Sequence, residues 1–338
     1  MPYDPFEPRE MLEVLRQIPP ARTFLKETFF KKTETHITEH VDIDIVKGGR
    51  RMAPFVHPRL PGQVVERDGF RTETFTPPHI KPKTQTQAED LLKRQAGESI
   101  FSGRSPSDRA AAVLADDLMT LDELITRREE WMCAQALFTG RVPVQGDGVD
   151  MVIDFGLSNV VTLSGANRWN QPTSSPMANL RGWHRQIVKG SGISPTICLM
   201  GTEVADVFLE NQQILKYMDL RKVEMGQIDP QQLPGGVTYY GYLKEFGIDL
   251  YGYVEWYRDD AGAEQLMVPP KSVLLASPTA RLTMHYGAIV DLEAGTVDLP
   301  RFPRSWTERD PSSRFVQVMS RPLPVPHQID SILVAQVL

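Results

Sequence analysis

The chain has 338 residues and is 41% hydrophobic, which allows a sizeable buried core and argues against wholesale disorder. Its length suggests about two domains. The 37 basic and 43 acidic side chains give a formal charge of −6. That balance disfavours a protein whose main task is to grip nucleic acid, because such proteins usually carry a basic face.

The signals for targeting and for thiol chemistry are weak. The first residues do not form a basic segment followed by an apolar run, so no signal peptide is expected, and no apolar stretch approaches the ~20 residues that span a bilayer. We therefore expect a chain that is made in a cytosol, stays soluble and has no membrane partner. Cys133 and Cys198 are isolated, which argues against a thiolate zinc site and favours buried, reduced thiols.

Residues 8–32 predict a short helical region that is followed by two apolar pairs. The pairs are Phe24-Leu25 and Phe29-Phe30, and polar residues separate them. They suit an anchor that docks on another molecule, and they suit an ordinary core helix equally well, because spacing alone does not separate the two.

Residues 33–75 predict a protruding ribbon. Apolar residues alternate with polar ones as in a half-buried strand, at Thr35, Ile37, Val41, Ile43 and Ile45. Gly48-Gly49 interrupts the alternation, strands are expected at 52–56 and 64–67, and Asp68-Gly69 is a hairpin signal before a return strand at 70–75. Because this segment is rich in Arg, Glu and Thr and poor in Leu, a long ribbon is favoured over a core sheet.

A long helix is predicted over residues 106–139. Ser105 is a suitable N-cap, Pro106 occupies the first helical position, and apolar residues then recur every three or four positions until Gly140. Such a helix would be ~50 Å long. A second capping-box sequence begins at Thr120 and allows a kink there.

From residue 150 the pattern becomes mixed α/β. Helices are expected at 176–189 and 202–217. Short strands are expected at 152–155, 196–200, 238–246, 248–258, 265–268, 272–275, 281–291, 315–319 and 329–337.

One motif could carry metal chemistry. His36, Glu39 and His40 spell HxxEH, which binds zinc when a helix brings both imidazoles to one ion. The alternating neighbourhood favours a strand instead, which would separate the two histidines by about 13 Å. We therefore expect two surface or interface histidines and no metal site.

Other catalytic signals are missing from the sequence. It contains neither a GxSxG nucleophile elbow nor a GxxxxGK[ST] phosphate loop. The short basic cluster at Lys47, Arg50 and Arg51 suits a solvated hairpin base better than a phosphate site. No catalytic residue and no cofactor are predicted, and the chain is not expected to be an enzyme.

Several marks along the chain resemble one family. They are Phe24-Leu25 with Phe29-Phe30, Phe75-Thr76-Pro77 followed by Ile80-Lys81-Pro82-Lys83, the long helix ending at Gly140, Asp154-Phe155-Gly156, Trp306 to Ser320, and Pro322-Leu323. In this order and spacing the chain, over roughly residues 20–338, resembles the major capsid proteins of lambda-like tailed bacteriophages, the major capsid protein E family.

The resemblance implies the α+β Hong Kong 97 phage capsid fold, in which an N-terminal arm, an extended β-hairpin loop, a peripheral domain and an axial domain follow one another. Residues 1–45 would be the arm and first strand, and 46–83 the extended loop. The peripheral domain would comprise 84–156 and 276–320 with its spine helix at 106–139. The axial domain would comprise 157–275, and 321–338 would be a C-terminal strand assigned to it.

The function implied by the resemblance is assembly. Hexamers and pentamers of the chain would form an icosahedral head that encloses double-stranded DNA without sequence-specific contacts. Decoration, scaffolding and portal proteins of the same phage would be partners, with the chain in the virion and, during assembly, in the host cytoplasm. The alternative is an encapsulin-type compartment shell, which shares the fold. Lys47, Lys81 and Lys83 lie near the loop, but no acid is marked beside them, so cross-linking is not expected.

Contacts between subunits are expected from the arm and the ribbon. An isolated two-stranded ribbon is marginal in water, and we expect the apolar pairs of the arm to need partners outside their own segment. The interface candidates are Phe24, Phe29, Phe30, Arg50, Arg51, Met52, Phe55, Arg67, Phe70 and Phe75.

Overall fold

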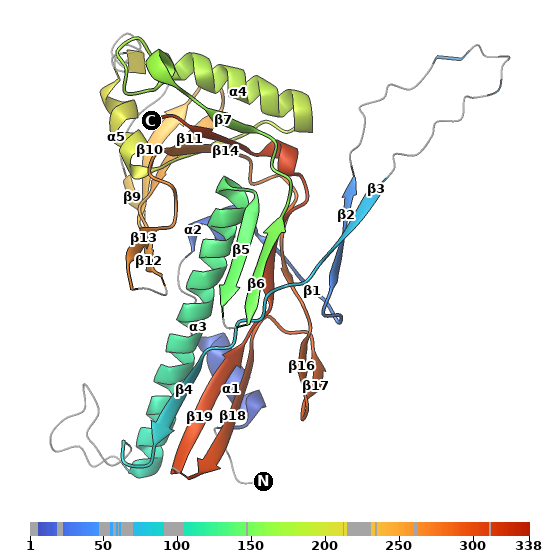
Figure 1. The fold of residues 1–338 in the computed structure, drawn as a ribbon, viewed down its shortest axis with the longest axis vertical. Coiled ribbons are helices and arrows are strands. Elements are labelled where there is room, and N and C mark those ends of the chain that lie inside the picture. Colours follow the sequence, from blue (N-terminus) through green and yellow to red (C-terminus); the bar gives the residue numbers. More distant parts are fainter. Residues whose placement is uncertain are drawn as a thin grey trace.

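The computed structural model describes residues 6–18, 23–46, 55–56, 59, 61, 70–90, 105–146, 148–211, 213–214, 231–233, 235–259, 262–310 and 312–338. The molecule is elongated, with one long helix, α3, along its lower part and a large sheet covered by helices at the other end (Figure 1). None of the described helices is long and apolar enough to cross a membrane.

Helix α3 (Pro106–Phe138) confirms the predicted long helix. The Ser105 hydroxyl accepts a hydrogen bond from the Asp108 N–H, and the Asp108 carboxylate accepts one from the Ser105 N–H, each at 3.2 Å. This capping box satisfies donors that the first turn leaves free. The helix is continuous through Thr120, so the second capping-box sequence starts no new helix. Gly140 follows the last turn of the helix with a φ of +67°, a backbone conformation that favours glycine. A Cβ atom added at this position would clash with the Cβ atom of Leu157.

Two three-stranded sheets flank α3. One has the order β18 (Phe302–Arg309), β19 (Ser312–Met319), β4 (Lys83–Gln87), all antiparallel. With α1 (Pro8–Gln17) it buries one apolar cluster against the first half of α3. In the other, β15 (Leu282–Tyr286) lies between β1 (Lys32–Thr35), which is parallel to it, and β20 (Pro322–Pro326), which is antiparallel.

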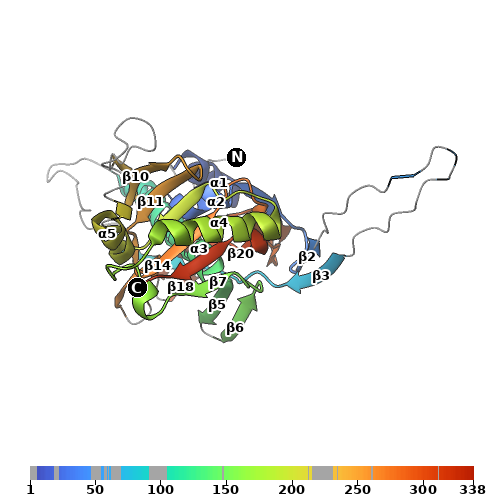
Figure 2. The same ribbon diagram turned by 90° about the horizontal axis from the view of Figure 1, so that it is seen from above.

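A seven-stranded mixed sheet forms the other end of the molecule. Its order is β7 (Val160–Thr162), β21 (Leu333–Gln336), β14 (Ser272–Ala276), β8 (Ile197–Met200), β11 (Ile248–Tyr253), β10 (Val237–Leu243) and β9 (Gln231–Leu233). Helices α4 (Pro176–Ser191) and α5 (Thr202–Glu210) bury their apolar faces in the cluster built on this sheet, and Figure 2 shows α4 lying across it.

Four two-stranded hairpins complete the described strands. They are β2 (Val41–Val46) with β3 (Phe70–Phe75), β5 (Arg141–Gly146) with β6 (Val149–Asp154), β12 (Trp256–Arg258) with β13 (Glu264–Leu266), and β16 (Ile289–Asp291) with β17 (Gly295–Val297). Short 3₁₀ turns occur at η1 (Gly165–Asn167) and η2 (Ile329–Ser331). The predicted strand at 329–337 therefore begins only at Leu333.

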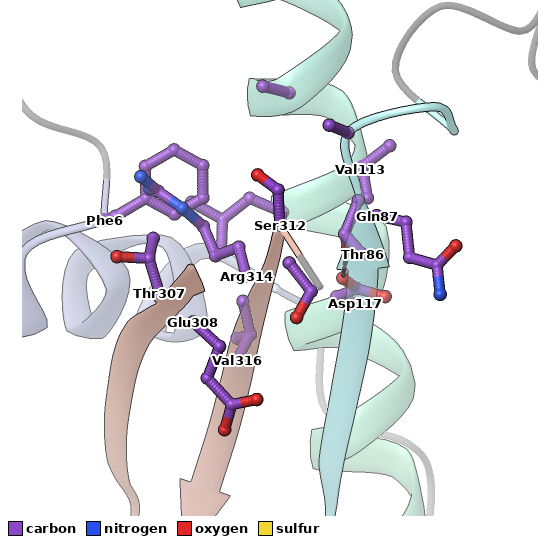
Figure 3. Close-up of a pocket in the computed structure, with 14 residues that line it drawn as sticks. Phe6, Thr86, Gln87, Val113, Asp117, Thr307, Glu308, Ser312, Arg314 and Val316 are labelled. Carbon is purple, nitrogen blue, oxygen red and sulfur yellow. Dashed lines mark hydrogen bonds between the residues drawn. The ribbon is translucent and has the colours of Figure 1, made fainter. Parts of the chain in front are cut away.

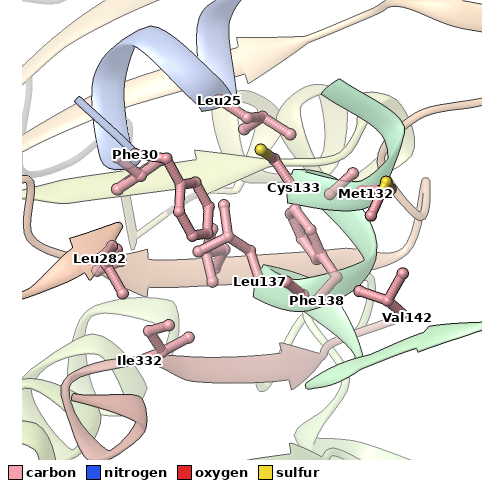
Figure 4. Packing of buried hydrophobic residues seen from close by; sticks show 14 of the residues in the cluster. Leu25, Phe30, Met132, Cys133, Leu137, Phe138, Val142, Leu282 and Ile332 are labelled. Atoms are coloured by element: carbon pink, nitrogen blue, oxygen red, sulfur yellow. The ribbon is translucent and has the colours of Figure 1, made fainter. Parts of the chain in front are cut away.

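The main core joins the two ends of the molecule. The short helix α2 (Phe24–Phe29) packs on the last turns of α3, where Leu25 and Phe30 meet Cys133 and Leu137 (Figure 4). Cys133 and Cys198 are buried free thiols. Burial raises the pKa of Cys133 well above its usual value and that of Cys198 to about 12, so both stay protonated.

Candidate functional site

The most conspicuous surface feature is the hairpin of β2 and β3, called the ribbon below. Its register runs from Val41 opposite Phe75 to Val46 opposite Phe70. Both views show the two strands pointing away from the rest of the molecule (Figures 1 and 2). The Thr74 hydroxyl donates to the Asp42 carboxylate at 2.6 Å across the pair. An isolated two-stranded ribbon is marginal in water, so its root needs support.

Apolar packing supplies part of that support. Val41 is fully buried in the main core, and the Phe75 ring packs on Phe155 with their centroids 5.6 Å apart. Phe75, expected at an interface, therefore lies at the root of the ribbon, partly covered by its own subunit.

Arg321 supplies the rest of the support at the root of the ribbon. Its side chain is only 7% exposed, and it donates to the Ala288 carbonyl at 2.8 Å and to the Pro77 carbonyl at 3.4 Å. The same guanidinium lies 3.3 Å from the Glu39 carboxylate. Because Glu39 precedes β2 and Pro77 follows β3, one buried cation holds both chain segments at the root.

The structure describes few of the other residues of the ribbon segment that were predicted to lie at a subunit interface. Phe55 is fully exposed. The Phe70 backbone lies in β3, but its side chain is outside what the structure describes. Arg50, Arg51, Met52 and Arg67 lie outside the described residues, as do the strands expected at 64–67 and most of 52–56.

The apolar pairs of the arm have partners in their own subunit. Phe29 and Phe30 are each 1% exposed in the main core, and the Phe24 ring lies 5.3 Å from that of Tyr251. Phe29 and Phe30, expected at a subunit interface, are therefore buried within their own subunit, as the core-helix alternative predicts. Folding of α2 onto α3 supplies contacts that residue spacing cannot reveal.

A buried ion cluster, which the sequence analysis missed, holds α2 to α3. Glu130 is 2% exposed, and its carboxylate accepts hydrogen bonds from the Leu25 N–H at 2.7 Å, the Lys26 N–H at 3.0 Å and the Tyr253 hydroxyl at 2.9 Å. Burial raises the pKa of Glu130, although these donors favour its charged form. The carboxylate thus caps the first turn of α2.

Its neighbour Glu129 is fully buried. The Arg301 guanidinium donates to it at 2.6 and 3.1 Å, Lys26 Nζ at 2.6 Å and the Tyr286 hydroxyl at 2.9 Å. Burial alone would raise the pKa of Glu129, but the charges of Arg301 and Lys26 outweigh it and hold the pKa below its usual value. The sequence contains a signal that Glu129 is buried, because this residue falls on the apolar stripe of the long helix, four residues after Ile125 and three before Met132.

The two histidines of HxxEH have separate partners. His36 Nε2 lies 2.8 Å from Nδ1 of His285, whereas His40 Nδ1 lies 3.0 Å from the Thr76 hydroxyl. Residues 37–40 form a bend between β1 and β2, so the predicted continuous strand is wrong here. The chain leaves the edge of β15 at this point in order to enter the ribbon.

Large apolar side chains are exposed on three of the hairpins. They are Val149 and Val152 on β5–β6, Trp256 and Leu266 on β12–β13, and Val290 and Leu292 on β16–β17. Exposed apolar patches commonly mark contacts between proteins. Sequence reasoning missed these side chains because short hairpin strands have the same composition as core strands.

A pocket of about 250 Å³ lies between the start of α1, β4, β19 and α3 (Figure 3). Its lining includes Asp117, Glu308 and Arg314, and the Arg314 guanidinium lies 3.5 Å from the centroid of the Phe6 ring. None of the described residues that line it is His or Cys.

Comparison of the sequence with known protein families identifies the family to which this chain belongs. The sequence profile of the family described as phage major capsid protein E matches residues 7–337. The chain belongs to this family. The resemblance predicted from the sequence is thereby confirmed, and the chain is a phage major capsid protein rather than a member of the encapsulin alternative.

Individual relatives agree with this assignment. The P21 prophage-derived major head protein of Escherichia coli O6:H1 is 26% identical over 98% of this chain and 99% of its own length. The major capsid protein of Escherichia phage lambda is 26% identical over 87% of this chain and 88% of its own.

Solved structures establish the fold of this capsid protein. A prophage protein of Escherichia coli CFT073, assigned as a capsid protein, superposes with a TM-score of 0.75 at 20% identity and covers 98% of this chain and 99% of its own. A phage-related protein of Bordetella bronchiseptica RB50 gives a TM-score of 0.54 at 13% identity, covering 96% and 95%. The capsid protein has the α+β Hong Kong 97 phage capsid fold that the resemblance implied.

Proposed function

We propose that this capsid protein acts by assembly alone, forming hexamers and pentamers of a closed icosahedral head around double-stranded DNA. The observation that carries the proposal is the ribbon, which is fixed at its root by Arg321 and Val41 and points away from its own subunit. A rigidly rooted element of this kind supplies one half of a contact, and an adjacent subunit supplies the other.

Exposed apolar side chains support the same proposal. Phe55 on the ribbon segment is fully exposed, as is Leu292 on β16–β17. Covering such side chains on a neighbouring subunit contributes about 25 cal/mol per Å² of apolar surface removed from water. In the proposed assembly Arg50, Arg51, Met52, Arg67 and Phe70 act with Phe55 on the adjacent subunit.

The proposed division of the chain into structural regions follows that of the fold family. Residues 1–45 are the arm and first strand, 46–83 the extended loop, 84–156 with 276–320 the peripheral domain, and 157–275 the axial domain. The segment 321–338 was expected to be an axial strand, but it divides between the two domains: β20 pairs with β15 beside α3, and only β21 joins the seven-stranded sheet. Decoration, scaffolding and portal proteins are the proposed partners, the virion and the host cytoplasm the proposed locations, and DNA is enclosed without sequence readout. No catalytic step is proposed, and the net charge of −6 suits a shell that does not grip DNA tightly.

The experiment replaces residues 50–74 with a short Gly-Ser turn in the full chain, produced together with the assembly proteins of its phage. Electron microscopy and sedimentation should show soluble subunits or small oligomers in place of closed heads. Thermal unfolding that matches the unaltered chain would show that the subunit itself is folded. Normal heads from the deletion variant would overturn the proposal that the ribbon joins subunits.

A matched substitution gives a finer measurement. Phe55→Ser should lower the yield of closed particles, whereas Thr74→Ser, which keeps the hydroxyl bonded to Asp42, should not. Equal yields from the two variants would contradict a role for Phe55.

A further inference from the structure

Three histidines and a glutamate gather where the arm strand meets the peripheral sheet, apart from the ribbon root and the ion cluster. Glu34 on β1 is directly opposite His285 on β15 in the parallel pairing. His36 follows the end of β1, and His327 follows the end of β20 on the other side of β15. Strand pairing therefore brings together side chains from three distant parts of the sequence.

The atoms that face one another in this cluster are of the kind that binds metals. Nε2 of His36 lies 2.8 Å and a carboxylate oxygen of Glu34 lies 3.6 Å from Nδ1 of His285. All three donor atoms lie within 4.8 Å of one another. Tetrahedral Zn²⁺ with bonds of about 2.0–2.1 Å separates its ligand atoms by about 3.3 Å. The two separations that involve His285 are each within about 0.5 Å of this value, and the separation between Glu34 and His36 is at most 4.8 Å.

We propose that Glu34, His36 and His285 bind one divalent transition-metal ion, for which Zn²⁺ is the best match. Two imidazoles and one carboxylate form a set that Zn²⁺ accepts with a water as fourth ligand. Glu34 and His36 are only partly buried, which gives an ion and that water a route from solvent. The ion would tie β1 to β15 immediately before the chain enters the ribbon.

The second layer of contacts suits a metal-bound His285. A metal-bound histidine nearly always donates its other ring N–H to a fixed acceptor. Nε2 of His285 lies 3.0 Å from Nε2 of His327, which can accept that proton.

Lys32 is the competing cation. It pairs with one carboxylate oxygen of Glu34, while the other oxygen faces His285. The Lys32 side chain is 62% exposed, so it can remain on the outer oxygen or turn into solvent without leaving a buried charge. The Glu34 carboxylate can thus bind the metal ion through one oxygen and pair with Lys32 through the other.

The test is calorimetric titration of the full capsid protein, as purified subunits, with ZnCl₂, together with metal analysis after dialysis. We expect about one Zn²⁺ per chain, with His36→Ala and Glu34→Gln each weakening binding at least tenfold. His40→Ala is the matched control, because it removes the other histidine of the same motif, which contacts Thr76. It should bind like the unaltered chain.

Thermal unfolding separates binding at this site from binding elsewhere. Zn²⁺ should raise the unfolding temperature of the unaltered chain and of His40→Ala, and should leave that of His36→Ala unchanged. The inference is overturned if the unaltered chain binds no Zn²⁺ at micromolar concentration. It is also overturned if His36→Ala and His40→Ala bind equally well, or if the His40 variant alone loses binding.

Discussion

Arg321 and Glu39 meet at the root of the ribbon, with a guanidinium nitrogen 3.3 Å from a carboxylate oxygen. The pair is unequal, because the Arg321 side chain is 7% exposed and that of Glu39 is 54% exposed. The buried guanidinium is held chiefly by the carbonyls of Ala288 and Pro77. The direction in which the ribbon leaves the subunit therefore depends on a residue that lies some 280 positions away from the start of β2, in a chain of 338 residues.

The first prediction concerns this contact. Arg321→Met should lower the free energy of unfolding by roughly 2–4 kcal/mol, because buried carbonyls lose their donor. Glu39→Gln should cost less than about 1 kcal/mol, since a half-exposed partner contributes little. Urea unfolding of both variants measures the difference, and equal stabilities would contradict the assigned role of Arg321.

The second prediction concerns the buried ion cluster. Glu129→Gln should destabilise the subunit by roughly 3 kcal/mol, because Lys26 and Arg301 lose the charge that compensates them in a buried site. The figure lies at the low end for such pairs because Arg301 keeps its 2.7 Å contact with Asp122. Glu123→Gln, an exposed change on the same helix, should stay within about 0.5 kcal/mol in the same denaturant titration. Similar effects from the two variants would argue against the cluster as a stabilising unit.

The third prediction is the pH dependence of that stability. The pKa of Glu129 is lowered in the folded protein, so its contribution is complete above the ordinary value of 4.5. It should be lost as the pH falls below 4.5 through the folded pKa, since the unfolded chain takes up the proton first. The raised pKa of Glu130 acts in the opposite sense.

Comparing variants isolates the Glu129 contribution. The difference in unfolding free energy between the unaltered chain and Glu129→Gln should be constant from pH 7 to about pH 5 and should shrink at lower pH. Chemical denaturation at a series of pH values measures it. A difference that grows on acidification would show that the sign assigned to Glu129 is wrong.

The fourth prediction concerns the thiols. Burial raises the pKa of both Cys133 and Cys198, so neither forms the reactive thiolate in the folded subunit. Iodoacetamide at pH 8 should modify both only after the protein is denatured, as read by mass spectrometry, and gels run with and without reductant should be identical. Rapid labelling of either cysteine in the native protein would contradict the prediction.

Local features of the chain were predictable from the sequence alone. Helix α3 follows from Ser105, Pro106 and Gly140 together with apolar steps of three and four, because capping and amphipathic spacing act within a few residues. The return strand at 70–75 follows from a turn signal beside it in the same way. The family was recognisable because several such local marks recur in a fixed order.

Contacts between distant segments were decided only by the tertiary structure. Alternation through residues 35–45 predicted one strand, but pairing with β15 ends at Thr35 and the chain bends before β2. Phe29 and Phe30 suited an exposed anchor equally well until α2 was placed on α3. His36 meets His285 across 249 positions, and Glu129 meets Arg301 across 172. Short-range propensity carries no information about which strands become neighbours, so these sites exist only once the sheets have closed around α3.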